Sequence, residues 1–266
     1  MTRRRLGQHF LYDPAILKRM VESAGLLPED TVVEIGPGPG RLTKVLAEKV
    51  RRVIAIELDG RLYERLRGEL AGYENIELIR ADALKYPYDA LDSFKAVANI
   101  PYFITTPILF KLLEVRSRIK SATLMVQKEI AERIVARPGG KQYGVLSLMV
   151  QYSSSPTLKF FVPRGAFRPA PKVDSAVIHL EIHEKPVVTV ADENLFFRVI
   201  KTAFSQRRKM LSNALASLPG NIRDLLVQAG IDPSRRAETL GIEDFVRLAD
   251  LLQRQRRLDS GGDSAL

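Results

Sequence analysis

The chain has 266 residues, 45% hydrophobic and 27% charged, a composition typical of a soluble protein with one large domain and one small appended domain. It contains no cysteine and three histidines, which excludes disulfides, thiolate metal sites and cysteine nucleophiles and leads us to expect no metal. No apolar run is long enough to cross a bilayer and no signal-type segment follows the first residues, so we expect a cytoplasmic protein without a membrane partner.

The formal net charge of +10 is concentrated in three stretches that contain no acidic residue, namely residues 1–12, 133–173 and 194–223. Together they hold 16 of the 41 basic residues, so the rest of the chain carries 25 positive and 31 negative charges. A charge that served only solubility would be spread more evenly. This concentration favours a surface that follows a phosphate backbone; the alternative is a basic protein with no polyanionic partner.

Predicted helices and buried strands alternate through the first half of the chain. Asp13-Pro14 has the pattern of a helix cap followed by proline in the first turn, and the helix that it opens is predicted to end near Ala24. We predict strands at 31–35, 53–58, 76–80, 95–98 and 122–127, and helices at 41–50, 60–70, 107–114 and 129–136. This alternation predicts βαβ units and a parallel sheet.

The pattern changes in the second half. Residues 157–162 and 173–183 read as two strands, and the period of two in the second indicates an antiparallel strand at the end of the sheet. From about Val190 onward the chain is predicted to be entirely helical. We therefore expect an α/β domain at 1–185, a small all-α domain at 186–257 and a disordered tail at 258–266.

The run Gly36-Pro37-Gly38-Pro39-Gly40 between a predicted strand and a helix has the character of a nucleotide-binding turn, because glycine allows a ligand to approach the backbone closely. Its spacing differs from the G-x-G-x-x-G of dinucleotide folds. The two prolines also remove N–H groups that a pyrophosphate would need. The run therefore favours a ligand without phosphates, and Glu34 just before it is a candidate anchor for a cationic or amine-bearing group.

Acidic residues end the second and third predicted strands. Glu57 is placed to accept hydrogen bonds from both hydroxyls of a ribose, and Asp82 from an adenine amine. Either acid alone is more often a solvated loop residue. With Glu34 they stand at three successive strand ends, where ligands of open α/β sheets bind. The combination resembles the class I methyltransferase fold, which binds S-adenosylmethionine; a nicotinamide-dependent oxidoreductase is an alternative.

Asn99-Ile100-Pro101-Tyr102 directly follows the fourth predicted strand. Adenine N6 is a poor nucleophile because its lone pair is delocalised into the ring. The Asn99 oxygen and a nearby backbone carbonyl would accept hydrogen bonds from N6 and favour a more nucleophilic nitrogen, while Tyr102 would stack on a base that has left its helix. The alternative is a strand-ending turn. The position of Asn99-Ile100-Pro101-Tyr102 one strand after Asp82 favours the acceptor site over this alternative. The segment also resembles the amino-methyltransferase signature.

Further motifs identify a family. Residues 7–11 resemble its N-terminal cofactor motif, with His9 where asparagine is usual, and 162–176 resemble its late loop. Residues 204–211 and 236–245 resemble its basic segment and its C-terminal segment. From about Leu6 to Arg257, the chain thus resembles the ribosomal RNA adenine-N6 dimethyltransferases, specifically the small-subunit KsgA family.

The resemblance implies that 1–185 is the catalytic domain that binds S-adenosylmethionine and that 186–257 binds rRNA, and it implies roles for individual residues. It places cofactor contacts on His9, Leu11, Gly36, Glu57, Asp82 and Asn99, and phosphate contacts on Arg207, Arg208 and Lys209. Asn99, Tyr102 and Phe167 would form the catalytic site. Phe167 would stack on the second face of the target adenine, with a core-filling role as an equally weighted alternative.

The resemblance also implies the activity. Two adjacent adenosines in the 3′-terminal hairpin loop of small-subunit rRNA would each receive two methyl groups from S-adenosylmethionine, with an immature small subunit as substrate and a monomeric enzyme. A large-subunit adenine dimethyltransferase of the antibiotic-resistance type is the nearest alternative. A non-catalytic RNA-binding assembly factor is an alternative of another class.

Overall fold

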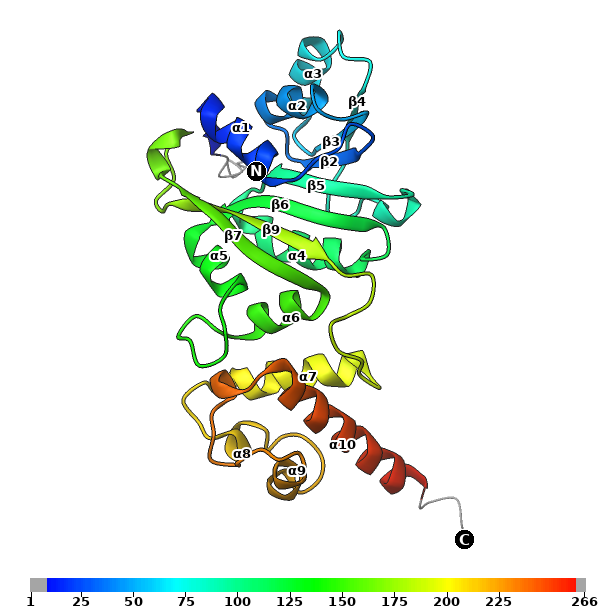
Figure 1. Ribbon diagram of the computed structural model, residues 1–266, viewed down its shortest axis with the longest axis vertical. Helices are drawn as coiled ribbons and strands as arrows, with labels where there is room; N and C mark the ends of the chain where they lie inside the picture. The colour runs from blue at the N-terminus through cyan, green and yellow to red at the C-terminus, as the bar shows by residue number, and fades with distance from the viewer. Residues whose placement is uncertain (1–8, 262–266) are drawn as a thin grey trace, which may run out of the picture. The chain divides into compact units, whose positions relative to one another are not determined.

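The computed structural model describes residues 9–261, which form two compact units (Figure 1). Unit 1 comprises the residues up to Glu132 together with Ser153–Lys185, and unit 2 comprises Arg133–Tyr152 together with the residues from Pro186 onward. The chain therefore passes between the units three times, whereas the sequence suggested a single boundary near residue 185. No helix in the described part of the chain is long and apolar enough to span a membrane.

Unit 1 is built on a seven-stranded sheet in the order β4-β3-β2-β5-β6-β9-β7. The strands are β2 Thr31–Ile35, β3 Arg52–Glu57, β4 Ile76–Arg80, β5 Phe94–Asn99, β6 Ile119–Gln127, β7 Ser154–Val162 and β9 Ser175–Ile182. The first five in this order run parallel, and β9 pairs antiparallel with both β6 and β7. The parallel sheet is as expected. The strand at its antiparallel end is β7, because β9 is covered on both edges.

Helices cover both faces of this sheet, with α1, α2 and α3 on one side and α4 and α5 on the other (Figure 1). Their bounds are α1 Pro14–Ser23, α2 Arg41–Ala47, α3 Gly60–Glu69, α4 Thr105–Glu114 and α5 Lys128–Ile134. The start of α1 is as expected, since the Asp13 carboxylate accepts from the N–H groups of Ala15 and Ile16. Covering on both faces explains why strands such as β3 are apolar along nearly their whole length.

The strand order reverses between β2 and β5, so the chain leaves these two strands in opposite directions. Such a switch point opens a crevice at the carboxyl ends of the strands. Gly36, Glu57, Asp82 and Asn99 lie at the carboxyl ends of β2, β3, β4 and β5. The fold thus brings the predicted site residues to one edge of the sheet.

A second, two-stranded sheet was not predicted from the sequence. β1, Phe10–Leu11, pairs antiparallel with β8, Phe167–Arg168, so that Leu11 lies opposite Phe167. Both strands are too short to leave a periodic pattern. The pairing joins the N-terminal motif to the late loop, which are about 160 residues apart.

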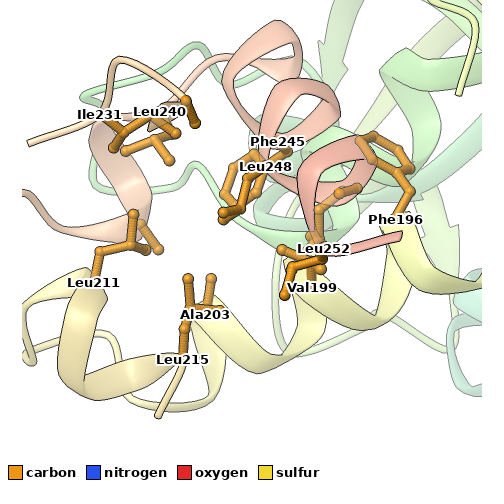
Figure 2. Close-up of a cluster of buried hydrophobic side chains, with 14 of the residues drawn as sticks. Phe196, Val199, Ala203, Leu211, Leu215, Ile231, Leu240, Phe245, Leu248 and Leu252 are labelled. Atoms are coloured by element: carbon orange, nitrogen blue, oxygen red, sulfur yellow. The ribbon is translucent and has the colours of Figure 1, made fainter. Parts of the chain in front are cut away.

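Unit 2 consists of helices and the loops that connect them, and its described residues contain no strand. Its helices are α6 Val145–Ser153, which was not predicted and whose last residue falls in unit 1, α7 Glu193–Ser205, α8 Leu211–Ala214, α9 Ile222–Gln228 and α10 Ile242–Gly261. Figure 2 shows apolar side chains of α7, α8 and α10 pointing toward one another, among them Phe196, Phe245 and Leu252. Tyr143 and Tyr152 join the same buried cluster, which is why 133–152 belongs to this unit. The helix α10 continues past residue 258 to Gly261, so part of the expected tail is helical, and residues 262–266 lie outside the described part.

Candidate active site

A pocket opens at the carboxyl ends of β2, β3, β4 and β5. Its empty space is about 830 Å³ when the part that is open to solvent is included. Its lining comes from five segments: His9 and Phe10; Ile35, Gly36 and Gly38; Ile56, Glu57 and Leu58; Ala81, Asp82 and Ala83; and the run from Asn99 to Ile104. The predicted cofactor residues His9, Gly36, Glu57, Asp82 and Asn99 therefore meet in one cavity.

The glycine loop has no free N–H group to offer a phosphate. The N–H groups of Gly36, Gly38 and Gly40 donate to Ile56 O, Glu57 Oε2 and Pro37 O at 2.9, 3.2 and 2.9 Å. Residues 37 and 39 are prolines and have none. A pyrophosphate needs several such donors, so this geometry disfavours a dinucleotide cofactor.

The backbone at Gly38 leaves no room for a side chain. Its φ is +56°, and a Cβ atom on it would lie 2.7 Å from the ring of Phe10. The loop therefore packs directly against β1, and Phe10 forms part of the cavity wall. This contact places the N-terminal segment over the cofactor end of the pocket.

Glu57 is buried at the end of β3. Its Oε1 accepts from the Asp59 N–H at 2.8 Å and its Oε2 from the Gly38 N–H at 3.2 Å. Burial raises the pKa of Glu57 above its ordinary value of 4.5, although these hydrogen bonds oppose the shift. Each carboxylate oxygen has two lone pairs, so both can still accept a hydroxyl from a ligand.

Asp82 follows β4, the strand next to β3, and lines the same pocket as Glu57. One of its oxygens accepts from the Leu84 N–H at 2.9 Å, which leaves acceptor capacity facing the pocket. Leu58 lines the same wall with 55% of its surface exposed. Leu58 was not predicted as a site residue from the sequence; the signal that could have identified it is an apolar residue directly after an acid at a strand end.

Asn99 ends β5 and its side chain is fixed. The amide nitrogen Nδ2 donates to the carbonyl oxygen of His9 at 3.1 Å. This bond determines which way the amide points, since a carbonyl can accept only from the nitrogen. The amide oxygen is consequently the end left to accept a hydrogen bond from a ligand.

His9 contributes to the site through both its backbone and its ring. Its Nδ1 lies 2.8 Å from the carbonyl oxygen of Pro169, and its ring centroid lies 5.6 Å from that of Tyr102. Nδ1 must carry the proton in this contact because Pro169 O only accepts. The imidazole thus joins the N-terminal segment to the loop after β8, while the backbone of His9 orients Asn99. Gly7 and Gln8 of the same motif lie outside the described residues.

Tyr102 stands beside Asn99 in a 3₁₀ turn, Tyr102–Ile104. Its hydroxyl is 2.6 Å from Oγ of Ser175, at the start of β9. Burial raises the pKa of the Tyr102 hydroxyl, so it stays neutral near pH 7. The ring lines the pocket, where it can offer a face to a base.

Phe167 and Leu11 do not line this cavity, although Leu11 lines a smaller pocket that shares Phe10, Gly36 and Asn99 with it. Phe167 is 2% exposed and packs in the core of unit 1, and Leu11, opposite it in the β1–β8 pair, is buried in the same cluster. A ring enclosed on both faces has none left for a base, so the structure favours the core-filling interpretation of Phe167.

The three basic residues of 207–209 differ in their surroundings. Arg207 donates to the carbonyl oxygens of Lys141 and Tyr143 at 2.9 and 3.1 Å and pairs with Glu238 at 3.5 Å. Arg208 and Lys209 are exposed, and their side chains form no hydrogen bond or ion pair with any described residue. Arg207 therefore holds the loop before α6 in place, which leaves the other two cations available to a ligand.

Glu34 is fully buried at the end of β2, behind the glycine loop. Its Oε2 has no hydrogen-bond partner among the described residues. Burial raises the pKa of Glu34 to about 8, and the nearby Glu57 carboxylate adds to the shift. The carboxyl is consequently largely neutral at pH 7, which argues against the ion-pairing anchor suggested by the sequence.

Replacing Glu34 with glutamine is expected to raise the melting temperature at pH 8 by roughly 3 °C or more, and far less at pH 5. The folded pKa lies above the unfolded value, so ionisation favours the unfolded chain increasingly as pH rises from 4.5 toward 8. The amide removes this penalty. Thermal melts across this pH range, with exposed Glu29→Gln as the matched control, measure it; a gain that is the same at both pH values would contradict the buried neutral acid.

Among the described residues, no three or more histidine, aspartate or glutamate side chains gather closely enough to hold a metal ion. The polar groups around the pocket are hydrogen-bond acceptors suited to hydroxyl and amine groups.

A comparison with protein families matches residues 1–254 to the model described as ribosomal RNA adenine dimethylase. The chain belongs to the ribosomal RNA adenine dimethylase family. Among curated relatives, the ribosomal RNA small subunit methyltransferase A of Moorella thermoacetica is 48% identical over 95% of this chain and 93% of its own length. The protein of the same name from Shouchella clausii is 46% identical over 93% and 88%.

Solved structures agree with this family. A dimethyladenosine transferase from Plasmodium falciparum has a TM-score of 0.81 at 31% identity and covers 94% of this chain and 98% of its own. The 23S rRNA methyltransferase ErmE has a TM-score of 0.72 at 30% identity, with 92% and 99% covered. The fold is therefore that of these methyltransferases, and the family and fold predicted from the sequence are confirmed.

Proposed function

We propose that this protein uses S-adenosylmethionine to dimethylate the N6 amines of two adjacent adenosines in the 3′-terminal hairpin loop of small-subunit rRNA. It would act as a monomer in the cytoplasm, on an immature small subunit. The observation that carries the proposal is Asn99, whose amide nitrogen is held by His9 O so that its oxygen is left as an acceptor at the pocket. The N6 amine of adenine has N–H groups that can donate a hydrogen bond to this oxygen.

The cofactor end of the pocket suits a sulfonium nucleoside. Glu57 would hold the ribose hydroxyls, Asp82 the adenine amine and Leu58 an adenine face. Gly38 brings the loop against Phe10, which leaves the wall apolar and without phosphate donors. When bound, S-adenosylmethionine supplies an activated methyl group, so the protein has to orient the reactants rather than activate them with a metal.

At the acceptor end, catalysis would come from positioning. The Asn99 oxygen would accept from one N6–H and draw electron density toward nitrogen, and Tyr102 would hold the base by stacking. The Ser175 contact fixes the Tyr102 ring in advance. After transfer, the positively charged N6 loses its proton readily, and water is a sufficient base.

Contacts with rRNA phosphates are proposed for exposed cations in each unit. The loop between β7 and β9 carries Arg164, Arg168 and Lys172, all exposed, and Arg208 and Lys209 are exposed in unit 2. Curated relatives from Moorella thermoacetica, Shouchella clausii and Clostridium botulinum, at 46–48% identity, are named for the small subunit, which supports that target over the large-subunit alternative. The assembled site around Asn99 and Glu57 argues against a purely non-catalytic factor.

Changing both Arg208 and Lys209 to glutamine is expected to weaken RNA binding and to reduce the salt slope of binding by roughly 1.5, with no change in melting temperature. Arg207→Gln should instead lower the melting temperature by about 1 to 3 °C, because the exposed Lys141 carbonyl and the part-buried Tyr143 carbonyl lose their donor. Binding titrations at several salt concentrations and thermal melts measure both. An unchanged slope in the double variant, or an unchanged melting temperature in Arg207→Gln, would refute the respective role.

The activity is tested by incubating the protein with tritiated S-adenosylmethionine and, in separate reactions, with immature small and large subunits from a strain that lacks the endogenous enzyme. We expect four methyl groups per small subunit and reverse-transcription stops at two adjacent adenosines near the 3′ end. A stop in large-subunit RNA would favour the antibiotic-resistance type instead. No transfer to any RNA would leave the non-catalytic factor as the better interpretation.

A further inference from the structure

Phe103 lies at the mouth of the acceptor site with its ring largely in solvent. It is 58% exposed, lies between Tyr102 and Ile104 in the 3₁₀ turn, and lines the same pocket as Tyr102. A single exposed aromatic residue is ordinary on a protein surface. This one is informative because it is placed on the rim of a cavity that is proposed to receive a nucleobase.

The geometry of the turn separates the two rings. A 3₁₀ helix has three residues per turn, so consecutive side chains leave the backbone about 120° apart. Tyr102 is further held by its hydroxyl, 2.6 Å from Ser175 Oγ. Phe103 therefore cannot press on the opposite face of the base that stacks on Tyr102, and it faces a different group at the pocket entrance.

The neighbouring loop supplies the charge that a single strand of RNA requires. The Ser175 contact ties the 3₁₀ turn to this loop, where Asp174 accepts from the Arg164 N–H at 3.0 Å. Arg164, Arg168 and Lys172 of the loop are exposed, and none has an ion pair with a described residue. Aromatic faces beside backbone-binding cations are the usual way in which proteins hold single-stranded nucleic acid.

We propose that Phe103 stacks on the base of the nucleotide that flanks the target adenosine and so keeps the loop strand open while the target occupies the Tyr102 pocket. This inference rests on the proposed function, since it takes an adenosine in single-stranded RNA as the substrate. Stacking accepts any base, because every base has an aromatic face. Phe103 is thus a positioning residue for RNA, and cofactor binding does not depend on it.

The test uses immature small subunits reconstituted from rRNA in which 2-aminopurine replaces, in turn, the base on each side of the target. Stacking on an aromatic ring quenches 2-aminopurine fluorescence, so wild-type protein should quench one of the two positions. Phe103→Ala should abolish that quenching and raise the KM for RNA about 5- to 100-fold, with little change in cofactor affinity. Phe103→Tyr should restore both, because it retains the ring.

Phe161→Ala is the matched control, since Phe161 is 51% exposed on β7 and does not line the pocket. Melting temperatures of all variants verify folding. If the wild-type protein methylates these subunits but Phe103→Ala quenches the fluorescence and binds as well as wild type, the stacking role is wrong and the proposed function stands. If wild-type protein transfers no methyl group to any RNA, the proposed function fails, and the inference about Phe103 fails with it.

Discussion

Replacing Asn99 with alanine is expected to lower turnover by about 100- to 1000-fold, with a change in S-adenosylmethionine affinity of less than about fivefold. The reason is that the Asn99 oxygen is the acceptor left free by the bond from Nδ2 to His9 O. Single-turnover methyl transfer and calorimetric titration of the cofactor separate the two effects. Equal losses in both quantities would mean that Asn99 mainly holds the cofactor.

Asn99→Asp offers a sharper comparison. A carboxylate retains an oxygen acceptor but has no N–H for the His9 carbonyl, so two oxygens would repel each other at 3.1 Å. We expect turnover between those of wild type and Asn99→Ala. Turnover equal to wild type would show that the His9 contact does not orient the side chain.

Replacing Glu57 with alanine is expected to lower S-adenosylmethionine affinity on the order of 100-fold, because two charge-assisted acceptors for the ribose are lost. Affinity for RNA should remain within about twofold of wild type. Glu57→Gln keeps one acceptor oxygen and should lose less. Calorimetric titration of the cofactor with each variant measures these affinities, and exposed Glu29→Gln is the matched control. Cofactor affinity within twofold of wild type in Glu57→Ala would show that Glu57 does not bind the ribose.

The pH dependence of cofactor affinity gives an independent check of Glu57. Protonation removes acceptor capacity, so affinity should fall as pH falls through the pKa of Glu57, which burial places above the ordinary 4.5. Glu57→Gln has no such group and should show a flatter profile in the same range. A wild-type profile that stays flat down to pH 4 would contradict a carboxylate acceptor at this position.

Several features followed from the sequence alone, because they depend on local rules. Strand and helix periods, the Asp13-Pro14 cap and the glycine run fix where elements begin and end within a few residues. Parallel pairing then brings the carboxyl ends of successive strands to one edge. For that reason Glu57, Asp82 and Asn99 were placed together without any tertiary information.

Only the tertiary structure decided which side chains of similar residues are exposed and available to a ligand. Phe167 and Phe103 are both aromatic residues beside recognisable motifs, yet the first is buried by the β1–β8 pair and the second is exposed at the pocket. Similarly, the Arg207 guanidinium donates hydrogen bonds to carbonyl oxygens of residues more than 60 positions away in the chain, while the exposed Arg208 side chain is available to bind a ligand. Such contacts form between segments that are distant in the chain, and their energies depend on packing and desolvation that no local pattern records.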